Sequence, residues 1–111
     1  MFARVSKYEL PSGRAHEAIP AFREAIERIR ALDGLDRALL LMPRDGTRAV
    51  TITLWQTELA MESSRVAASR ARSAAASEVD GEVTSTEEYE IVADMTGVEP
   101  GAIQEQSVRS G

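Results

Sequence analysis

The chain has 111 residues and a net charge of −5, with 43% hydrophobic and 28% charged residues. This length predicts one domain, and the acidic balance argues against nucleic acid or an anionic membrane surface as a partner. Because the sequence contains no cysteine, it excludes disulfides, thiol catalysis and zinc–thiolate sites. The N-terminus has no apolar signal segment and no stretch of 18 apolar residues occurs, so a soluble, cytoplasmic protein is expected.

The first predicted elements are a strand and an amphipathic helix. Residues 2–10 alternate apolar and polar side chains until Pro11 stops the strand. From Ala15, apolar residues recur at helical spacing, which predicts a helix that ends at Gly34 as its C-cap. Pro20 lies within this pattern, so the helix is either kinked there or begins its regular part near Pro20.

The middle of the chain predicts a β-hairpin. Apolar residues at 38–42 and β-branched residues at 49–55 flank a turn that contains Asp45-Gly46, a strong hairpin signal. We expect these two antiparallel strands to form the middle of the sheet. Both parities of both strands are apolar, so both faces of the hairpin need cover from water.

A second helix and a fourth strand complete the pattern. Thr57 is the predicted N-cap of a helix over 58–77, which is rich in Ala and Arg and contains neither Gly nor Pro. Its small apolar residues either let the helix pack close to the sheet or leave room above it. Residues 83–93 form the fourth predicted strand, and 94–111 are expected to be a loosely held C-terminal tail.

The element order β-α-β-β-α-β predicts an α+β, ferredoxin-like domain over residues 1–93. Such a domain has a four-stranded antiparallel sheet with two helices on one face. Two helices cover only one face, and the other face of the hairpin is also apolar. We therefore predict a homodimer in which a second copy packs sheet against sheet.

Four stretches of the sequence carry a resemblance to a known family: Gly34-Leu35, Ala38 to Leu41, Ala49 to Glu58, and Tyr89 to Val92. With them, the chain resembles the antibiotic biosynthesis monooxygenase-like domains of the dimeric α/β-barrel superfamily over roughly residues 2–93. That superfamily includes cofactor-independent quinone-forming monooxygenases, haem-degrading enzymes and members without an assigned activity. The resemblance implies a dimeric α/β barrel with a pocket between sheet and helices.

The resemblance implies that Trp55 lines this pocket, where its indole N–H needs a partner; the alternative is that Trp55 only fills the core. Ser6 and Tyr8 share a strand parity and are candidate donors into the pocket. Arg65 is a candidate charge partner for an anionic ligand. Haem-degrading members have an Asn and a His at the positions of Ser6 and Arg65, so haem ligation of that kind is not expected. No cofactor and no metal site are predicted.

Several other charged residues are assigned to solvent, including Arg70 and Arg72 on the second predicted helix. His16 lies beside the apolar stripe of the first helix, without a second ligand at a spacing suited to a metal. Glu87, Glu88 and Glu90 alternate between strand faces and are expected at a solvated strand end. One His and no Gly-rich loop predict neither a Ser–His–Asp triad nor a phosphate site.

The function that the resemblance implies is oxygenation of a small aromatic, phenol- or quinone-type substrate without metal or flavin. Because no general base is evident, the substrate itself would have to be acidic, and no catalytic residue is identified. Two alternatives remain open. One is a non-catalytic homodimer that binds a small apolar ligand, and the other is a structural or stress-related homodimer without a ligand.

Overall fold

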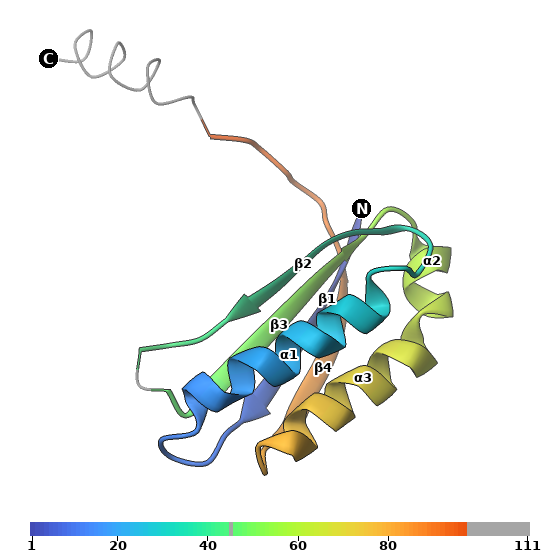
Figure 1. Cartoon of the computed structure of the whole chain (residues 1–111). Helices are drawn as coiled ribbons and strands as arrows, with labels where there is room; N and C mark the ends of the chain where they lie inside the picture. The colour runs from blue at the N-terminus through green and yellow to red at the C-terminus, as the bar shows by residue number, and fades with distance from the viewer. Residues whose placement is uncertain (45, 98–111) are drawn as a thin grey trace, which may run out of the picture.

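The structure, a computed structural model, describes residues 1–44 and 46–97. Its elements, in chain order, are β1 (Phe2–Glu9), α1 (Ala15–Ile29), β2 (Leu35–Leu41), β3 (Arg48–Trp55), α2 (Glu58–Ser63), α3 (Arg65–Glu78) and β4 (Glu82–Glu90). The strands form one antiparallel sheet in the order β2-β3-β1-β4. The helices lie on one face of this sheet (Figure 1). The predicted α+β, ferredoxin-like fold is confirmed.

The sequence predicted that the hairpin of β2 and β3 forms the middle of the sheet. This prediction is wrong, because only β3 is a central strand. β3 pairs with both β2 and β1, whereas β2 lies at the sheet edge with β3 as its neighbour. β1 pairs with β3 and β4 and is the other central strand. β2 therefore has apolar side chains on both of its faces although it is an edge strand of the sheet.

α1 runs through Pro20 and ends before the predicted C-cap. It begins at Ala15, so Pro20 lies inside it, and its C-cap is Arg30. The prediction of Gly34 as the C-cap is therefore wrong. Gly34 lies in the turn before β2 with a φ of +81°, and a Cβ placed there would overlap Ala60 Cβ of α2. Both the backbone conformation and this close approach require glycine.

Replacing Gly34 by Ala is expected to lower the free energy of unfolding by about 2 kcal/mol, because it adds both backbone strain and a steric clash. The double variant Gly34→Ala, Ala60→Gly removes the clash but not the strain, so it should recover part of the loss. Urea denaturation followed by circular dichroism measures both. An unchanged urea midpoint for Gly34→Ala would contradict this role of the glycine.

The predicted second helix is two helices, α2 and α3, separated at Ser64. Thr57 is the N-cap of α2, as predicted, and its side chain accepts a hydrogen bond from the backbone N–H of Ala60. At the break, the Met61 carbonyl accepts hydrogen bonds from Ser64 Oγ and from Arg4 Nη2. These side-chain donors compete with the helix ladder for that carbonyl, which explains the break.

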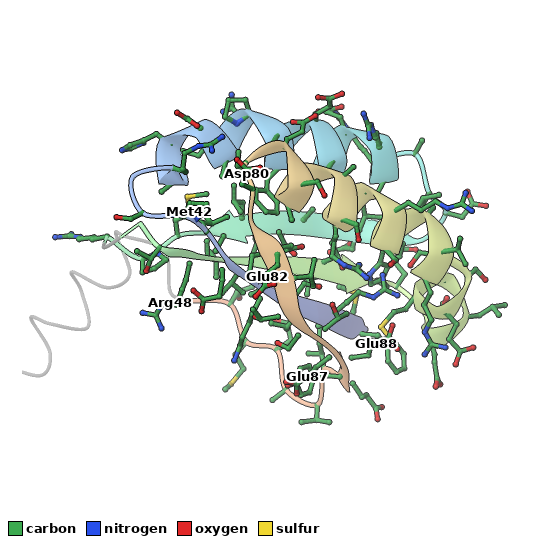
Figure 2. The ribbon with its side chains drawn as sticks, turned by 90° about the horizontal axis from the view of Figure 1, so that it is seen from below. Met42, Arg48, Asp80, Glu82, Glu87 and Glu88 are labelled. Carbon is green, nitrogen blue, oxygen red and sulfur yellow. The ribbon has the colours of Figure 1, made fainter. Side chains whose placement is uncertain are left out.

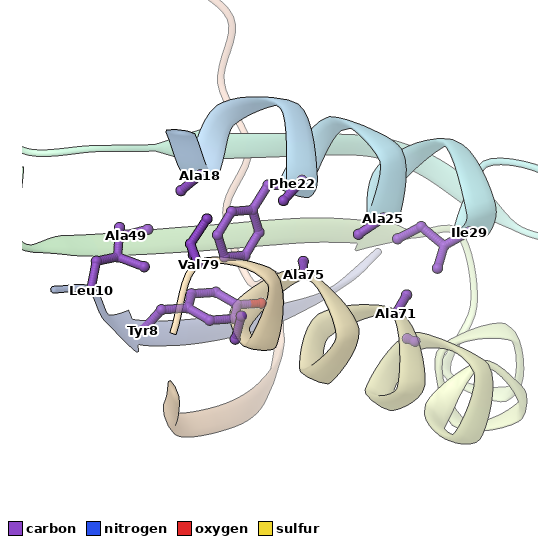
Figure 3. Packing of buried hydrophobic residues seen from close by; sticks show 13 residues of the cluster. Tyr8, Leu10, Ala18, Phe22, Ala25, Ile29, Ala49, Ala71, Ala75 and Val79 are labelled. Carbon is purple, nitrogen blue, oxygen red and sulfur yellow. The ribbon is translucent and has the colours of Figure 1, made fainter. Parts of the chain in front are cut away.

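The core lies between the sheet and the two long helices (Figure 3). Tyr8 of β1 and Phe22 of α1 meet edge to face, with ring centroids 4.6 Å apart and an interplanar angle of 74°. The buried residues that α3 contributes are all alanines: Ala68, Ala71, Ala75 and Ala76. Such small side chains let α3 pack close to α1 and leave part of the space above the sheet unfilled.

The sheet face opposite the helices is mostly apolar, with Lys7 and Glu87 as exposed charged residues on it. Figure 2 shows the helices on one side of the sheet only, with Glu87 directed to the other side. The strand register places these half-buried side chains on the uncovered face: Val5, Leu39, Val50, Ile52 and Leu54. Leu41 and Tyr89 on the same face are 46% and 49% exposed. We call this surface the outer sheet face.

The chain after β4 has no regular secondary structure over residues 91–97. The rest of the predicted tail, residues 98–111, lies outside the described residues, as does Asp45 of the predicted turn. Within the described part of the chain, every helix is too short or too polar to cross a membrane.

Candidate functional site

A cavity lies between the sheet and helices α1 and α3. Its volume is about 30 Å³, which is room for one or two water molecules. Its apolar lining residues are Phe22, Ala25, Ile26, Ile29, Ala38, Ala68 and Ala71. Leu39 of β2 also borders the cavity, although the strand register places it on the outer sheet face. A wider surface cleft of about 460 Å³ shares Ile26 and Ala38 with the cavity. Ile26 of α1 and Ala38 of the edge strand β2 therefore border both spaces.

One wall of the cavity carries hydroxyl groups from the central strands, namely those of Ser6, Tyr8, Thr51 and Thr53. Tyr8 Oη lies 2.9 Å from Thr51 Oγ1, and Ser6 Oγ lies 3.1 Å from Thr86 Oγ1. Burial raises the pKa of Tyr8 above its ordinary value of 10.0, so its hydroxyl keeps its proton at neutral pH. This wall thus offers neutral hydrogen-bonding groups.

Replacing Tyr8 by Phe is expected to lower the free energy of unfolding by about 1 kcal/mol, because the buried Thr51 hydroxyl loses its partner. The double variant Tyr8→Phe, Thr51→Val removes both hydroxyls and should be about as stable as the single variant. Denaturant unfolding of the wild type, Tyr8→Phe, Thr51→Val and the double variant measures this. If the two single losses simply add, the pair does not act as a unit.

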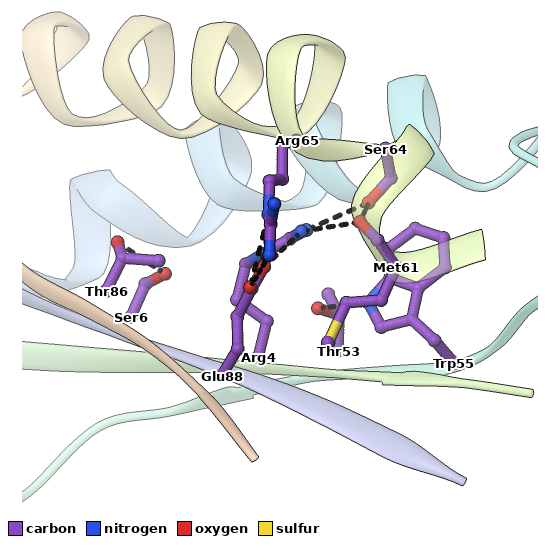
Figure 4. Close-up of polar contacts among 9 residues, drawn as sticks. All are labelled: Arg4, Ser6, Thr53, Trp55, Met61, Ser64, Arg65, Thr86 and Glu88. Carbon is purple, nitrogen blue, oxygen red and sulfur yellow. Dashed lines mark hydrogen bonds and ion pairs between the residues drawn. The ribbon is translucent and has the colours of Figure 1, made fainter. Parts of the chain in front are cut away.

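Arg4 connects the cavity to a charged network (Figure 4). Its side chain is 2% exposed and donates from Nη1 to Ser64 Oγ at 3.0 Å and from Nη2 to the Met61 carbonyl at 2.8 Å. Nε and Nη2 also donate to Glu88 Oε2, at 3.1 and 2.8 Å. From the solvent side, Arg65 Nε donates to the same carboxylate at 3.2 Å. Arg4 is therefore hydrogen-bonded and paired with Glu88, a carboxylate that it shares with Arg65.

Glu88 is the shared acceptor of this network. Hydrogen bonds from Arg65 and then Arg4 lower its pKa from 4.5 to about 2, although burial opposes the shift. The side chain of Glu88 is 23% exposed, so its assignment to a solvated strand end is wrong. It shares a sheet face with Arg4, its partner in the strand register. Glu87, Glu90 and His16 are exposed, as predicted.

Arg72 is the second cation of the cavity wall. It projects from α3, is half-buried and lines the cavity. It forms no hydrogen bond or ion pair with the described residues. Burial lowers its pKa below the ordinary value and the charge of Arg4 acts in the same direction, whereas the charge of Glu88 opposes them without a direct contact. Among the described residues, this guanidinium of the cavity wall therefore has no direct ion pair.

The four candidate site residues lie in two groups. Ser6 and Tyr8 line the cavity. Trp55 is completely buried but is not among the residues that line the cavity. Its indole Nε1 donates a hydrogen bond to Thr53 Oγ1 at 3.0 Å. The guanidinium carbon of Arg4 lies 5.7 Å from the centre of the Trp55 ring. Arg65 is exposed and pairs with Glu88.

Two cavity residues, Arg4 and Arg72, were not identified from the sequence. Arg4 has the same strand parity as Ser6 and Tyr8, so the alternation that selected those two also placed Arg4 on the helix side. Arg72 is four residues after Ala68, on a buried alanine stripe, which is a helical spacing toward the sheet. In both cases, a charged side chain at a position that faces the core could have indicated a residue of the site.

The fold is similar to solved structures at low sequence identity. A candidate antibiotic biosynthesis monooxygenase from Deinococcus radiodurans has a TM-score of 0.70 and 13% identity, with 88% of this chain and 99% of that chain covered. The heme-degrader MhuD from Mycobacterium tuberculosis, solved with two hemes bound in its active site, has a TM-score of 0.66 and 23% identity. There, 86% of this chain and 100% of that chain are covered.

A third similar structure is a protein of unknown function from Nitrosomonas europaea, with a TM-score of 0.65 and 15% identity. The match covers 87% of this chain and 94% of that chain. No protein-family model matches the chain, and no curated protein matches it by sequence. The chain thus has the fold of the antibiotic biosynthesis monooxygenase-like structures, as its resemblance implied.

The described cavity does not fit a ligated haem. The lining residues include no His, Cys or Met, and the Tyr8 hydroxyl is held by Thr51. His16, the single histidine of the sequence, is exposed on α1. Among the residues that the structure describes, no group of three or more His, Asp or Glu could hold a metal ion.

Proposed function

We propose that this protein is a homodimeric monooxygenase that oxidises a small aromatic, phenol-type substrate without a metal or flavin. The proposed site is the cavity between the sheet and helices α1 and α3. The observation that carries the proposal is the lining of this cavity, which combines apolar walls, neutral hydroxyls and a guanidinium. The fold shared with structures named as antibiotic biosynthesis monooxygenases supports the reaction class.

The proposed reaction balances without an external reductant. With 1-naphthol as a test substrate, one O₂ is consumed and one oxygen atom enters the ring para to the hydroxyl, giving 1,4-naphthoquinone. The other oxygen atom leaves as water with the two hydrogens that the phenol loses. The substrate supplies all four electrons, and the reaction requires that its anion be stabilised while bulk water is excluded.

The residues of the cavity suit these requirements. The Phe22, Ile26 and Ile29 side chains provide an apolar enclosure, and Tyr8 offers a hydroxyl that stays protonated. Because about 30 Å³ is less than an aromatic ring needs, substrate entry requires the cavity to widen. We expect this at the boundary between α1 and β2, where Ile26 and Ala38 border both the cavity and the surface cleft.

We also propose that a second copy covers the outer sheet face. No described helix lies over this face, and a monomer would leave its apolar side chains partly in contact with water. A two-fold dimer covers the same patch on both chains at once. The dimer also stiffens the sheet from which Ser6 and Tyr8 project into the cavity.

Oxygen consumption tests the proposed reaction. The purified protein, treated with a chelator and free of flavin absorbance, is mixed with 1-naphthol in an oxygen electrode, and the product is identified by mass spectrometry under ¹⁸O₂. We expect equimolar O₂ loss and a quinone that carries one ¹⁸O atom. Heat-denatured protein gives the background rate. No uptake above that background would reject the monooxygenase.

A second candidate function is a non-catalytic protein that binds a small aromatic ligand. The observation that favours it is that the described lining residues include no carboxylate and no histidine, so the cavity has no evident general base. Binding of 1-naphthol, measured by isothermal titration calorimetry, without oxygen uptake would support this function over the monooxygenase.

A further inference from the structure

The described residues that line the cavity include two positive charges and no negative charge. Arg4 and Arg72 both line the cavity, and no carboxylate is among its described lining residues. Glu88 lies outside the lining and pairs with Arg4 through two hydrogen bonds, although it shares its charge with Arg65. Arg72 has no such partner among the described residues. The uncompensated charge of the cavity is therefore that of Arg72.

An unpaired guanidinium in an apolar setting has an electrostatic cost that a counter-ion can remove. Besides the two arginines, the described cavity lining consists of apolar side chains, such as those of Phe22, Ile26 and Ile29, and of hydroxyls rather than acids. A guanidinium forms two parallel hydrogen bonds with a carboxylate and also binds a single anionic oxygen. The ring of such a ligand would contact the apolar walls.

We propose that the cavity selects aromatic anions, either carboxylates or phenolates, and that Arg72 is the residue that recognises the negative charge. This rests on the proposed function, because it assumes that the cavity is the ligand site. It also replaces Arg65 in that role, since Arg65 is exposed and already pairs with Glu88. For a phenol, the same contact would favour ionisation, which the cavity otherwise has no base to promote.

Two ligands of nearly equal shape and different charge test the selection. 1-Naphthoate and its neutral isostere 1-naphthamide are titrated into the protein by isothermal calorimetry at pH 7.5. We expect the anion to bind at least about tenfold more tightly than the amide. In Arg72→Met, which keeps much of the aliphatic side chain, this preference should vanish.

The matched control is Arg70→Met, because Arg70 lies on the same helix with its side chain exposed. This variant should keep the wild-type preference. Binding of a phenolate is measured separately, by the absorbance of 1-naphthol bound at pH 7.5. The long-wavelength band of the naphtholate anion should appear with wild type and with Arg70→Met but not with Arg72→Met.

The outcomes separate this inference from the proposed function. If wild type binds 1-naphthoate and 1-naphthamide equally well and bound 1-naphthol shows no phenolate absorbance, the proposed role of Arg72 is wrong. Binding of 1-naphthamide and neutral 1-naphthol would in that case still support an aromatic ligand site. Equal losses in Arg72→Met and Arg70→Met also overturn it. If no compound binds wild type, both the inference and the ligand site are wrong.

Discussion

Replacing Glu88 by Gln is expected to lower the free energy of unfolding by about 3 kcal/mol at pH 7. The substitution keeps the shape of the side chain but removes the only carboxylate that Arg4 contacts among the described residues. Arg4 is 2% exposed and cannot recover its hydration, so its charge is left buried without compensation. Partial exposure of Glu88 keeps the loss at the lower end of the range for buried pairs.

The pH dependence of this loss follows from the lowered pKa of Glu88. Because that pKa falls from 4.5 in the unfolded chain to about 2 in the fold, the carboxylate contributes its full stability above about pH 5. The contribution is lost as the pH falls toward 2. The difference in unfolding free energy between wild type and Glu88→Gln should therefore be constant from pH 8 to pH 5 and shrink below that.

Urea denaturation at fixed protein concentration across this pH range measures the difference. The matched control is Glu90→Gln, two residues further along β4 and exposed, which should change stability by less than about 0.5 kcal/mol. If Glu88→Gln and Glu90→Gln behave alike at pH 7, the network around Arg4 does not stabilise the fold.

Replacing Ile52 by Asp is expected to raise the dissociation constant of the proposed dimer by at least about a hundredfold, which is about 2.7 kcal/mol. Ile52 lies on central strand β3, and its register partners on the outer sheet face are Val5 and Leu39. A carboxylate there would have to be buried in an apolar contact between two sheets. Sedimentation velocity over a range of concentrations measures the equilibrium.

The control for this experiment is Ser73→Asp, which adds the same charge on the exposed side of α3. It should leave the dimer intact. A wild-type protein that sediments as a monomer at micromolar concentration would reject the proposal that a second copy covers the outer sheet face. It would leave the cavity on the helix side as an independent feature.

The fold could be predicted from the sequence because its signals are local. Strand alternation in 2–10, the turn residues before 49–55 and Thr57 at a helix start each depend on neighbouring residues. The break at Ser64 could not be predicted in this way, because it arises when Arg4 reaches the Met61 carbonyl from β1. The position of β2 at the sheet edge likewise depends on how distant strands pair.

The candidate site was predicted only in part, for a similar reason. Strand parity placed Ser6 and Tyr8 on one face of the sheet, and both line the cavity. The role of Trp55 came from resemblance, whereas the space beside this indole is occupied by Arg4. Which guanidinium is paired depends on three-dimensional contacts, so Arg65 and Arg72 could not be told apart by their position on a helix.

The central claim is that the cavity between sheet and helices is the ligand site, and isoleucine methyl NMR tests it most directly. 1-Naphthol is titrated into protein with ¹³C-labelled isoleucine methyl groups. Because Ile26 and Ile29 line the cavity and Ile52 lies on the opposite sheet face, we predict that the first two shift and Ile52 does not. Shifts confined to Ile52, or no shifts at all, would contradict the claim.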